Sequence, residues 1–135
     1  MLNPNIPVKK WFKTHIETLT GLTVYDGEAD YEAGGEYIVL EGRTSSQEQG
    51  KSGFISSVVI VIDIVTKSAN FGFKRAETIS DLITEGIDSD TDITLSSGFS
   101  ASALSIDGIR TLEGLNPADN VFRVLITYNL TVTQN

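Results

Sequence analysis

Apolar residues recur at two different spacings along the chain, and the change of spacing marks the expected elements. Between residues 8 and 19 they recur every three or four positions, as on one face of an α-helix, and Gly21 follows as a natural stop. The same spacing returns between residues 73 and 83, ahead of Gly86. The sequence therefore predicts two amphipathic helices, and the apolar face of the second consists of Phe73, Ala76, Ile79, Leu82 and Ile83.

Five further segments are rich in β-branched and aromatic residues, which favours strands. These segments are residues 22–26, 36–43, 54–65, 99–114 and 120–132, with a glycine break in the fourth at Gly108. The third segment is apolar on both faces, which is typical of a central strand with both faces covered or of a strand partly covered by another chain. Asp63 interrupts one of these faces, so we expect part of that face to meet water or a partner.

The predicted order of elements is helix, three strands, helix and two strands. Strands grouped in hairpins, with a helix between the groups, favour an α+β fold with a single antiparallel or mixed sheet. We expect about five strands with both helices packed on one face. A chain of 135 residues is long enough to bury one core, so we expect a single domain that spans residues 1–135.

Two polar segments interrupt the predicted elements. Residues 44–53, "TSSQEQGKSG", show no periodicity and are longer than the usual hairpin loop, so we expect a polar loop at the tip of a protruding hairpin. Residues 26–36 carry five acids, which are usual in a solvated loop but also fit a cation site or the charged edge of a lumen.

The composition limits what the protein can bind. Eighteen acidic and ten basic residues give a net charge of −8, which disfavours broad attraction to nucleic-acid phosphates. The sequence contains no cysteine, so disulfides and thiolate metal sites are excluded. No window reaches the roughly eighteen apolar residues of a membrane span, and the first residues lack the apolar core of a signal peptide.

Candidate catalytic motifs are incomplete. The Gly-Lys-Ser at residues 50–52 lacks the first glycine of a phosphate-binding loop, since Ser45 stands there, and a strand follows in place of a helix. The acids between residues 88 and 92 lack the glycine and the final glutamate of a calcium loop. His15 is the only histidine, and no serine-nucleophile elbow occurs. We therefore expect no enzyme activity, no cofactor and no metal.

The order of several segments resembles a known protein family. These segments are "WFKTHIETL", "VYDG", "YIVLEG", "VVIVIDIVTKSANFGFKRAETISDLI", "TLEG" and "NVFRVLITYNLTV". Together they resemble the small tail-completion and tail-terminator proteins of long-tailed bacteriophages, which include the tail-to-head joining proteins. The resemblance runs from Trp11 to Val132 and rests on shape and spacing. It implies a virion protein, assembled in the cytoplasm of the host bacterium, with neither enzyme activity nor cofactor.

The resemblance also implies partners. Copies of the chain would form a ring, usually of six, that caps the finished tail tube, ends its polymerisation and offers a docking surface for the head. The partners are then the chain itself, the tail tube protein and the head–tail connector or neck proteins. DNA would pass through the lumen without sequence-specific binding, and a net charge of −8 fits a ring through which a polyanion slides.

Two groups of residues are candidates for these contacts. The expected subunit or tube interface consists of Gln47, Glu48, Gln49, Lys51 and Asp63. The acidic loop expected at the lumen or the ring edge carries Asp26, Glu28, Asp30, Glu32 and Glu36. The bland alternative for the polar loop is a surface segment without a role.

Two other functions stay open at this point. One is a neighbouring role as a head-completion or neck protein at the head–tail interface. The other is a small-ligand-binding or hydrolytic α+β domain, in which Asp63 with Arg123 or Tyr128 would supply the polar groups of a pocket.

Overall fold

The structure is a computed structural model, and it describes residues 4–27, 35–50, 53–67, 74–95, 98–113 and 121–134. The elements are α1 (Asn5–Thr20), β1 (Val24–Asp26), β2 (Glu36–Gly50), β3 (Gly53–Lys67), α2 (Lys74–Gly86), β4 (Phe99–Glu113) and β5 (Val121–Gln134). This order confirms the predicted succession of helix, three strands, helix and two strands.

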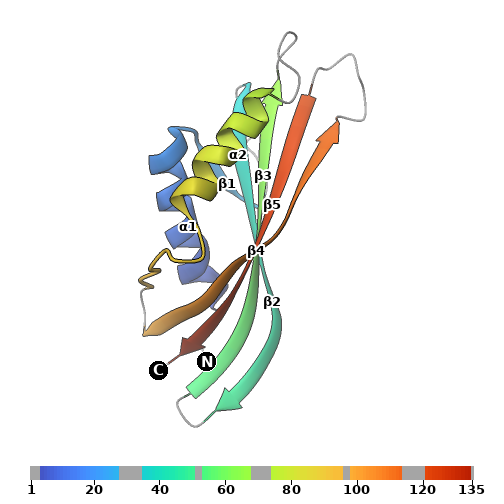
Figure 1. Ribbon diagram of the computed structural model, residues 1–135. Coiled ribbons are helices and arrows are strands. Elements are labelled where there is room, and N and C mark those ends of the chain that lie inside the picture. Colours follow the sequence, from blue (N-terminus) through green and yellow to red (C-terminus); the bar gives the residue numbers. More distant parts are fainter. Residues whose placement is uncertain are drawn as a thin grey trace.

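A single sheet carries all five described strands, in the order β1-β2-β3-β5-β4. β1 runs parallel to β2, whereas the pairs β2–β3, β3–β5 and β4–β5 are antiparallel. Both helices lie on the same face of this sheet (Figure 1). The predicted mixed α+β fold, with its helices on one face, is therefore confirmed.

The core lies between the two helices and the sheet. Alternate residues of β3 and β5 point into it, because successive side chains of a strand face opposite sides. The buried aliphatic residues of these strands that face the helices are Val58, Ile60, Ile62, Ile64, Val124, Ile126, Leu130 and Val132. The helices cover them with Val8, Phe12, Ile16, Ala76, Ile79 and Ile83. Each such side chain contributes roughly 1.5–3 kcal/mol when it leaves water, which explains why the apolar periodicity predicted these elements.

One residue of the predicted helix face is not in the core. Leu82 is 42% exposed, whereas Ile79 and Ile83 are buried. Leu82 follows Ile79 by three positions, and this places it on the flank of the apolar stripe where the sheet no longer covers it. Phe73, also assigned to this face, lies outside the described residues.

The segment 44–53 is not the polar loop that the sequence predicted. β2 continues to Gly50 and β3 begins at Gly53, and the two strands stay paired to that point. A register shift between Thr44 and Ser46 marks where the polar half of the hairpin begins. Polar side chains do not prevent strand formation here, because β3 supplies backbone partners whatever the side chains are. The predicted protrusion is correct, since the hairpin extends beyond both helices (Figure 1).

β4 is an irregular strand at one edge of the sheet. Its register against β5 shifts between Ser102 and Ser105, and again between Ile106 and Gly108, which confirms the break predicted near Gly108. Ala103, inside the first shift, has a φ of 54°, an uncommon backbone conformation for a residue with a side chain. The first half of β4 is therefore distorted, and the half after Gly108 is regular.

Candidate functional site

The sheet face opposite the helices is open in the described part of the chain. Its side chains come from β2, β3 and β5, and most are partly exposed while their neighbours on the other face are buried. These residues are Tyr37, Val39, Glu41, Val59, Val61, Asp63, Arg123, Leu125, Thr127 and Asn129. The sequence predicted that this face of β3 would be covered by other residues of the chain or by a second chain. The described residues bury Val65, which is 5% exposed, and leave Val59, Val61 and Asp63 partly exposed.

An ion pair between the two central strands, β3 and β5, lies on this open face. Arg123 donates from Nε to Oδ1 of Asp63 at 3.1 Å and from Nη2 to Oδ2, so the two planar groups meet side by side. The hydrogen bond to Asp63 raises the pKa of Arg123, and partial burial opposes this rise. The two charges neutralise each other. The open face therefore carries valine and leucine side chains beside an ion pair that has no net charge.

Tyr128 does not belong to this group. It lies on the helix-bearing face, fully buried, and its hydroxyl donates to the carbonyl oxygen of Ile87 at 2.6 Å. The suggested pocket of Asp63 with Tyr128 is therefore wrong, because the two side chains lie on opposite faces of the sheet. The alternative partner, Arg123, does meet Asp63.

The acidic segment contributes two described carboxylates, and each pairs with a helix. Asp26, at the end of β1, accepts from Nζ of Lys9 on α1 at 3.0 Å. Glu36, at the start of β2, pairs with the guanidinium of Arg75 on α2. Both carboxylates thus link a helix to the sheet. Glu28, Asp30 and Glu32 lie outside the described residues, and their position at a lumen or ring edge remains a prediction.

The candidate interface residues of the hairpin lie on a strand. Gln47, Glu48 and Gln49 belong to β2 and are paired with Ser56, Ile55 and Phe54 of β3. Lys51 lies outside the described residues. These residues thus belong to a two-stranded projection and not to a loop.

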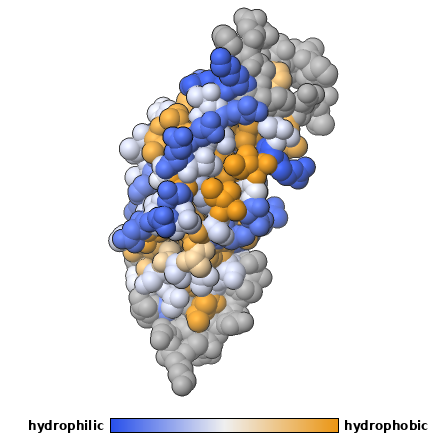
Figure 2. All heavy atoms as spheres, in the orientation of Figure 1, coloured by the Kyte–Doolittle hydropathy of each residue, from blue (hydrophilic) through white to orange (hydrophobic). Residues whose placement is uncertain are grey.

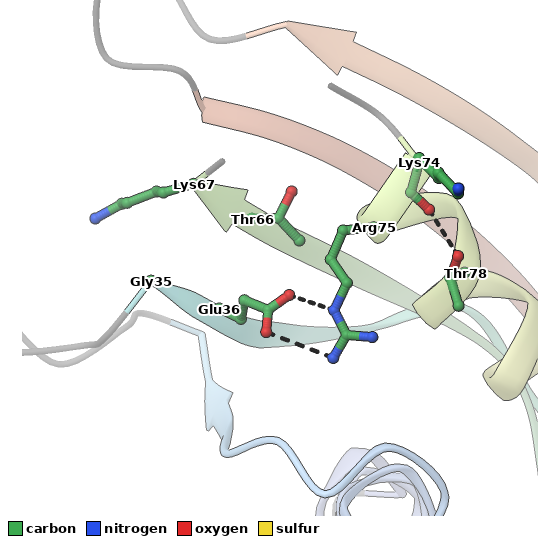
Figure 3. Close-up of a pocket in the computed structure, with 7 residues that line it drawn as sticks. All are labelled: Gly35, Glu36, Thr66, Lys67, Lys74, Arg75 and Thr78. Carbon is green, nitrogen blue, oxygen red and sulfur yellow. Dashed lines mark hydrogen bonds and ion pairs between the residues drawn. The ribbon is translucent and has the colours of Figure 1, made fainter. Parts of the chain in front are cut away.

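A pocket of about 500 Å³ opens where the sheet meets the start of α2 (Figure 3). Its described lining consists of Gly35, Glu36, Thr66, Lys67, Lys74, Arg75 and Thr78. Several of these groups already have partners: Arg75 holds Glu36, the hydroxyl of Thr78 donates to the carbonyl of Lys74 at 2.7 Å, and Lys67 lies 5.8 Å from the ring centre of Tyr37.

The described lining of this pocket does not include a pair of groups for acid–base hydrolysis. Its described lining includes one carboxylate, Glu36, which an arginine already binds, and it includes no histidine. General acid–base chemistry needs a positioned proton donor and acceptor that can reach a substrate. The described lining therefore carries basic and hydroxyl side chains, and it includes no paired proton donor and acceptor for acid–base catalysis.

The remaining candidate residues have local structural partners. His15 stacks on Trp11 with ring centres 3.8 Å apart, and its Nδ1 lies 3.0 Å from the carbonyl oxygen of Trp11. Asp88 accepts from the backbone N–H of Asp90 at 2.9 Å and from the hydroxyl of Thr91, which closes a turn after α2. Across the described ranges, no three acids, histidines or cysteines gather as a metal site would require.

No helix in the described part of the chain is long and apolar enough to cross a membrane.

Two strand edges are open among the described residues, and sequence reasoning missed both. β1 pairs only with Ile38, Val39 and Leu40, so β2 has one free side from Glu41 to Gly50. β4 pairs with β5 on one side, and on its other side the only described contact of this kind is a single bridge from Thr94 to Ser100. The available signal was the polar content on both faces of residues 105–113, which is typical of an edge strand.

The fold is shared with a protein in a solved virion assembly. The chain is similar to one chain in the structure "Virion of native gene transfer agent (GTA) particle", with a TM-score of 0.79 and 17% sequence identity. The match covers 98% of this chain and 99% of that chain. At this identity the likeness shows a common fold. No protein-family model matches the sequence, and no curated protein matches it either.

Proposed function

We propose that this chain is a structural component of a phage-like virion, and that it forms a ring on the end of the tail tube. The observation that carries this proposal is the end-to-end likeness to a chain of a virion particle, with 98% of this chain and 99% of the other superposed. The order of segments that resembles tail terminators supports the finer assignment.

The geometry is suited to assembly. Two open strand edges and one open sheet face offer three surfaces that a partner can cover. The paired hairpin projects beyond the helices, and it would contact the tube or the neighbouring subunit (Figure 1). The net charge of −8 would let DNA pass a ring of copies without the many phosphate contacts that would hold it.

In this proposal the ring ends tube polymerisation and provides the docking surface for the head. Its partners are the tube protein below and the connector or neck proteins above. The same observations also support a role as a head-completion or neck protein. In that role the protein would bind the connector and not the tube. The binding experiment therefore includes both the tail tube and the head–tail connector.

The test uses purified tail tubes and purified head–tail connectors. We expect the protein to bind tube ends, to appear there as a ring in negative-stain images, and to stop the addition of further tube protein. A matched control is Glu85→Gln, an exposed position on α2 away from both open edges, which should cap as the wild type does. Failure to bind tube ends or to halt their growth would exclude the terminator role, and binding to connectors alone would favour the neck role.

A further inference from the structure

The two open edges are complementary in direction. β2 is antiparallel to β3, β3 to β5, and β5 to β4, so β4 runs opposite to β2. In a ring whose axis follows the strands, every copy keeps the same direction along that axis. The open edge of β4 in one copy would then meet the open edge of β2 in the next copy in the antiparallel sense, as in the other strand pairs that flank β3 and β5.

The two free stretches lie at different levels along the strands. Following the registers across the sheet, Arg110 lies opposite Leu125, Leu125 opposite Asp63, and Asp63 opposite Val39. The regular half of β4 is therefore level with the part of β2 that β1 covers. The free half of β2 lies nearer the hairpin. For the two free stretches to pair, one copy must be shifted along the strand direction relative to the next. Closed sheets with tilted strands have such a shift between the first and last strands.

Exposed apolar side chains lie near both strand edges that such a junction would join. Ile106 and Ile109 of β4 are 39% and 52% exposed, and they lie opposite Tyr128 and Ile126, which places them on the helix-bearing face. Ile6, in the first turn of α1, is 65% exposed. The space-filling view of this side shows apolar residues reaching the surface among polar ones (Figure 2).

The first turn of α1 lies beside the free half of β2. The hydroxyl of Thr44 on β2 donates to Oδ1 of Asn5 at 3.3 Å, and this contact holds the start of α1 over that part of the sheet. A neighbour whose β4 joins β2 here would bring its Ile106 and Ile109 to the side of α1 that carries Ile6. Apolar surface would then be buried on the same face at which the backbone groups pair.

We propose that copies of this chain join through antiparallel pairing between the Ile109–Glu113 half of β4 and the free Glu41–Gly50 half of β2 in the next copy. The sheet would continue from copy to copy, with all helices on one side of the wall. This inference rests on the proposed ring, and it adds which surfaces close it. Long open strand edges are otherwise sites of uncontrolled association, and a second copy is a partner whose free edge matches in direction.

Cysteine cross-linking tests the pairing, because the native sequence has no cysteine. Arg110→Cys is combined with Arg43→Cys, Ser46→Cys or Glu48→Cys. The strand registers place all four positions on the sheet face opposite the helices. The three positions on β2 test three different offsets between the strands of adjacent copies. Residues opposite one another in an antiparallel pair have Cβ atoms about 5 Å apart, which is near enough for oxidation to a disulfide after small shifts. We expect at least one pair to give a ladder of oligomers after oxidation on capped tubes, and the single variants to stop at dimers.

A control variant separates the possible outcomes. Val61→Cys lies on a central strand of the open face, so it should not cross-link copies joined by their edges. Rings that cap tubes, give no ladder with any of the three pairs and cross-link through Val61→Cys would overturn the edge pairing while leaving the proposed function intact. A ladder from protein that caps no tubes would support the pairing and contradict the terminator role.

A second measurement uses the apolar residues. Ile109→Lys should weaken ring formation at least tenfold, because it places a charge at the junction. Leu82→Lys is the matched control, since Leu82 is similarly exposed but lies on α2, which packs on the central strands. Equal effects of the two substitutions on ring formation would count against the proposed junction.

Discussion

Tyr128 and Arg123 show how residues of one strand lie on opposite faces of the sheet. Arg123 pairs with Asp63 on the open face, whereas Tyr128 is buried under the helices. The hydroxyl of Tyr128 donates to the carbonyl of Ile87, just after α2, so one hydrogen bond ties the end of that helix to β5. A buried hydroxyl that lacked such a partner would cost free energy, which gives this contact its importance.

Tyr128 gives a prediction about alkaline pH. Burial raises the pKa of Tyr128 above its ordinary value of 10.0, with a smaller contribution from the charge of Asp88. The unfolded chain therefore loses this proton at a lower pH than the folded chain does. The stability that Tyr128 provides is complete below about pH 10 and falls as the pH rises above that value. Tyr128→Phe should cost about 1 kcal/mol at neutral pH and show a smaller loss on going to alkaline pH.

Urea unfolding at about pH 7 and about pH 10.5 measures both effects. The two proteins differ only at position 128, so the difference between their alkaline losses isolates Tyr128. Tyr25→Phe, at a partly exposed position, is the matched control and should keep the alkaline loss of the wild type. The same alkaline loss in Tyr128→Phe as in the wild type would show that Tyr128 titrates normally.

At the scale of elements, the spacing of apolar residues in the sequence predicted the helices and the central strands. The spacing of Phe12 and Ile16 predicted α1. The two-faced apolar run predicted β3 as a central strand or as one partly covered by another chain, and β3 is central in the sheet. The left-handed Gly21, with a φ of 72°, ends α1 as predicted, and its N–H donates to the carbonyl of Glu17. These features depend on residues close in the sequence, so local patterns suffice for them.

Features that depend on distant partners could not be predicted. The polar half of β2 is a strand because β3 pairs with it, and its own residues carry no apolar alternation. Lys9 and Asp26 are 17 positions apart, and Arg75 and Glu36 are 39 apart, so their pairing becomes visible only in the folded chain. Of the candidate site, Asp63 was predicted to lie on a face that meets water or a partner, but the open edges of β2 and β4 were not.

The contact between the helices gives a prediction at this scale. A Cβ atom added to Gly86 would lie 2.5 Å from both terminal carbons of Leu19, closer than packed atoms tolerate. Gly86→Ala should therefore destabilise the protein by about 1 kcal/mol, although alanine favours helices more than glycine does. In a Leu19→Ala background the same change should be neutral or stabilising, because the clash is gone.

Chemical denaturation of the four proteins in this cycle gives the coupling between the two positions. Gly108→Ala is the control, since an added Cβ there meets nothing within 4 Å and the backbone does not require glycine. It should change stability by no more than about 0.5 kcal/mol. Additive effects of Gly86→Ala and Leu19→Ala would mean that the helices do not meet at this point.

At the scale of the whole molecule, covered and open surfaces are distributed unequally. The helices protect one face of the sheet, while the other face, two strand edges and the far part of the β2–β3 hairpin lie beyond their cover (Figure 1). Eighteen acidic residues against ten basic ones keep free copies apart by repulsion at low salt. Such a chain would stay dispersed until a template such as a tube end brings several copies together.

The hairpin gives the last prediction. Because Gln47 pairs with Ser56, residues 48–55 can be replaced by Asn-Gly, which closes a two-residue turn and keeps the register. The removed stretch includes no described core residue, and Ile55 is 37% exposed, so the loss of stability should be no more than about 1–2 kcal/mol. If the projecting hairpin contacts the tube, the shortened protein should fold, with a melting temperature a few degrees lower, and should no longer cap tubes.

A length-matched variant shows which property of the hairpin matters. Alanine in place of Gln47, Glu48 and Gln49 removes the candidate contact groups but keeps the strand pairing, which depends on the backbone. Loss of capping in both variants would assign the contact to these side chains. Loss in the shortened protein alone would assign it to the backbone of the projection, either in contact with the tube or as part of the β2 edge that pairs with the next copy. Normal capping by the shortened protein would leave the hairpin as a surface projection without a role in assembly, because nothing else in that variant restores the missing contact.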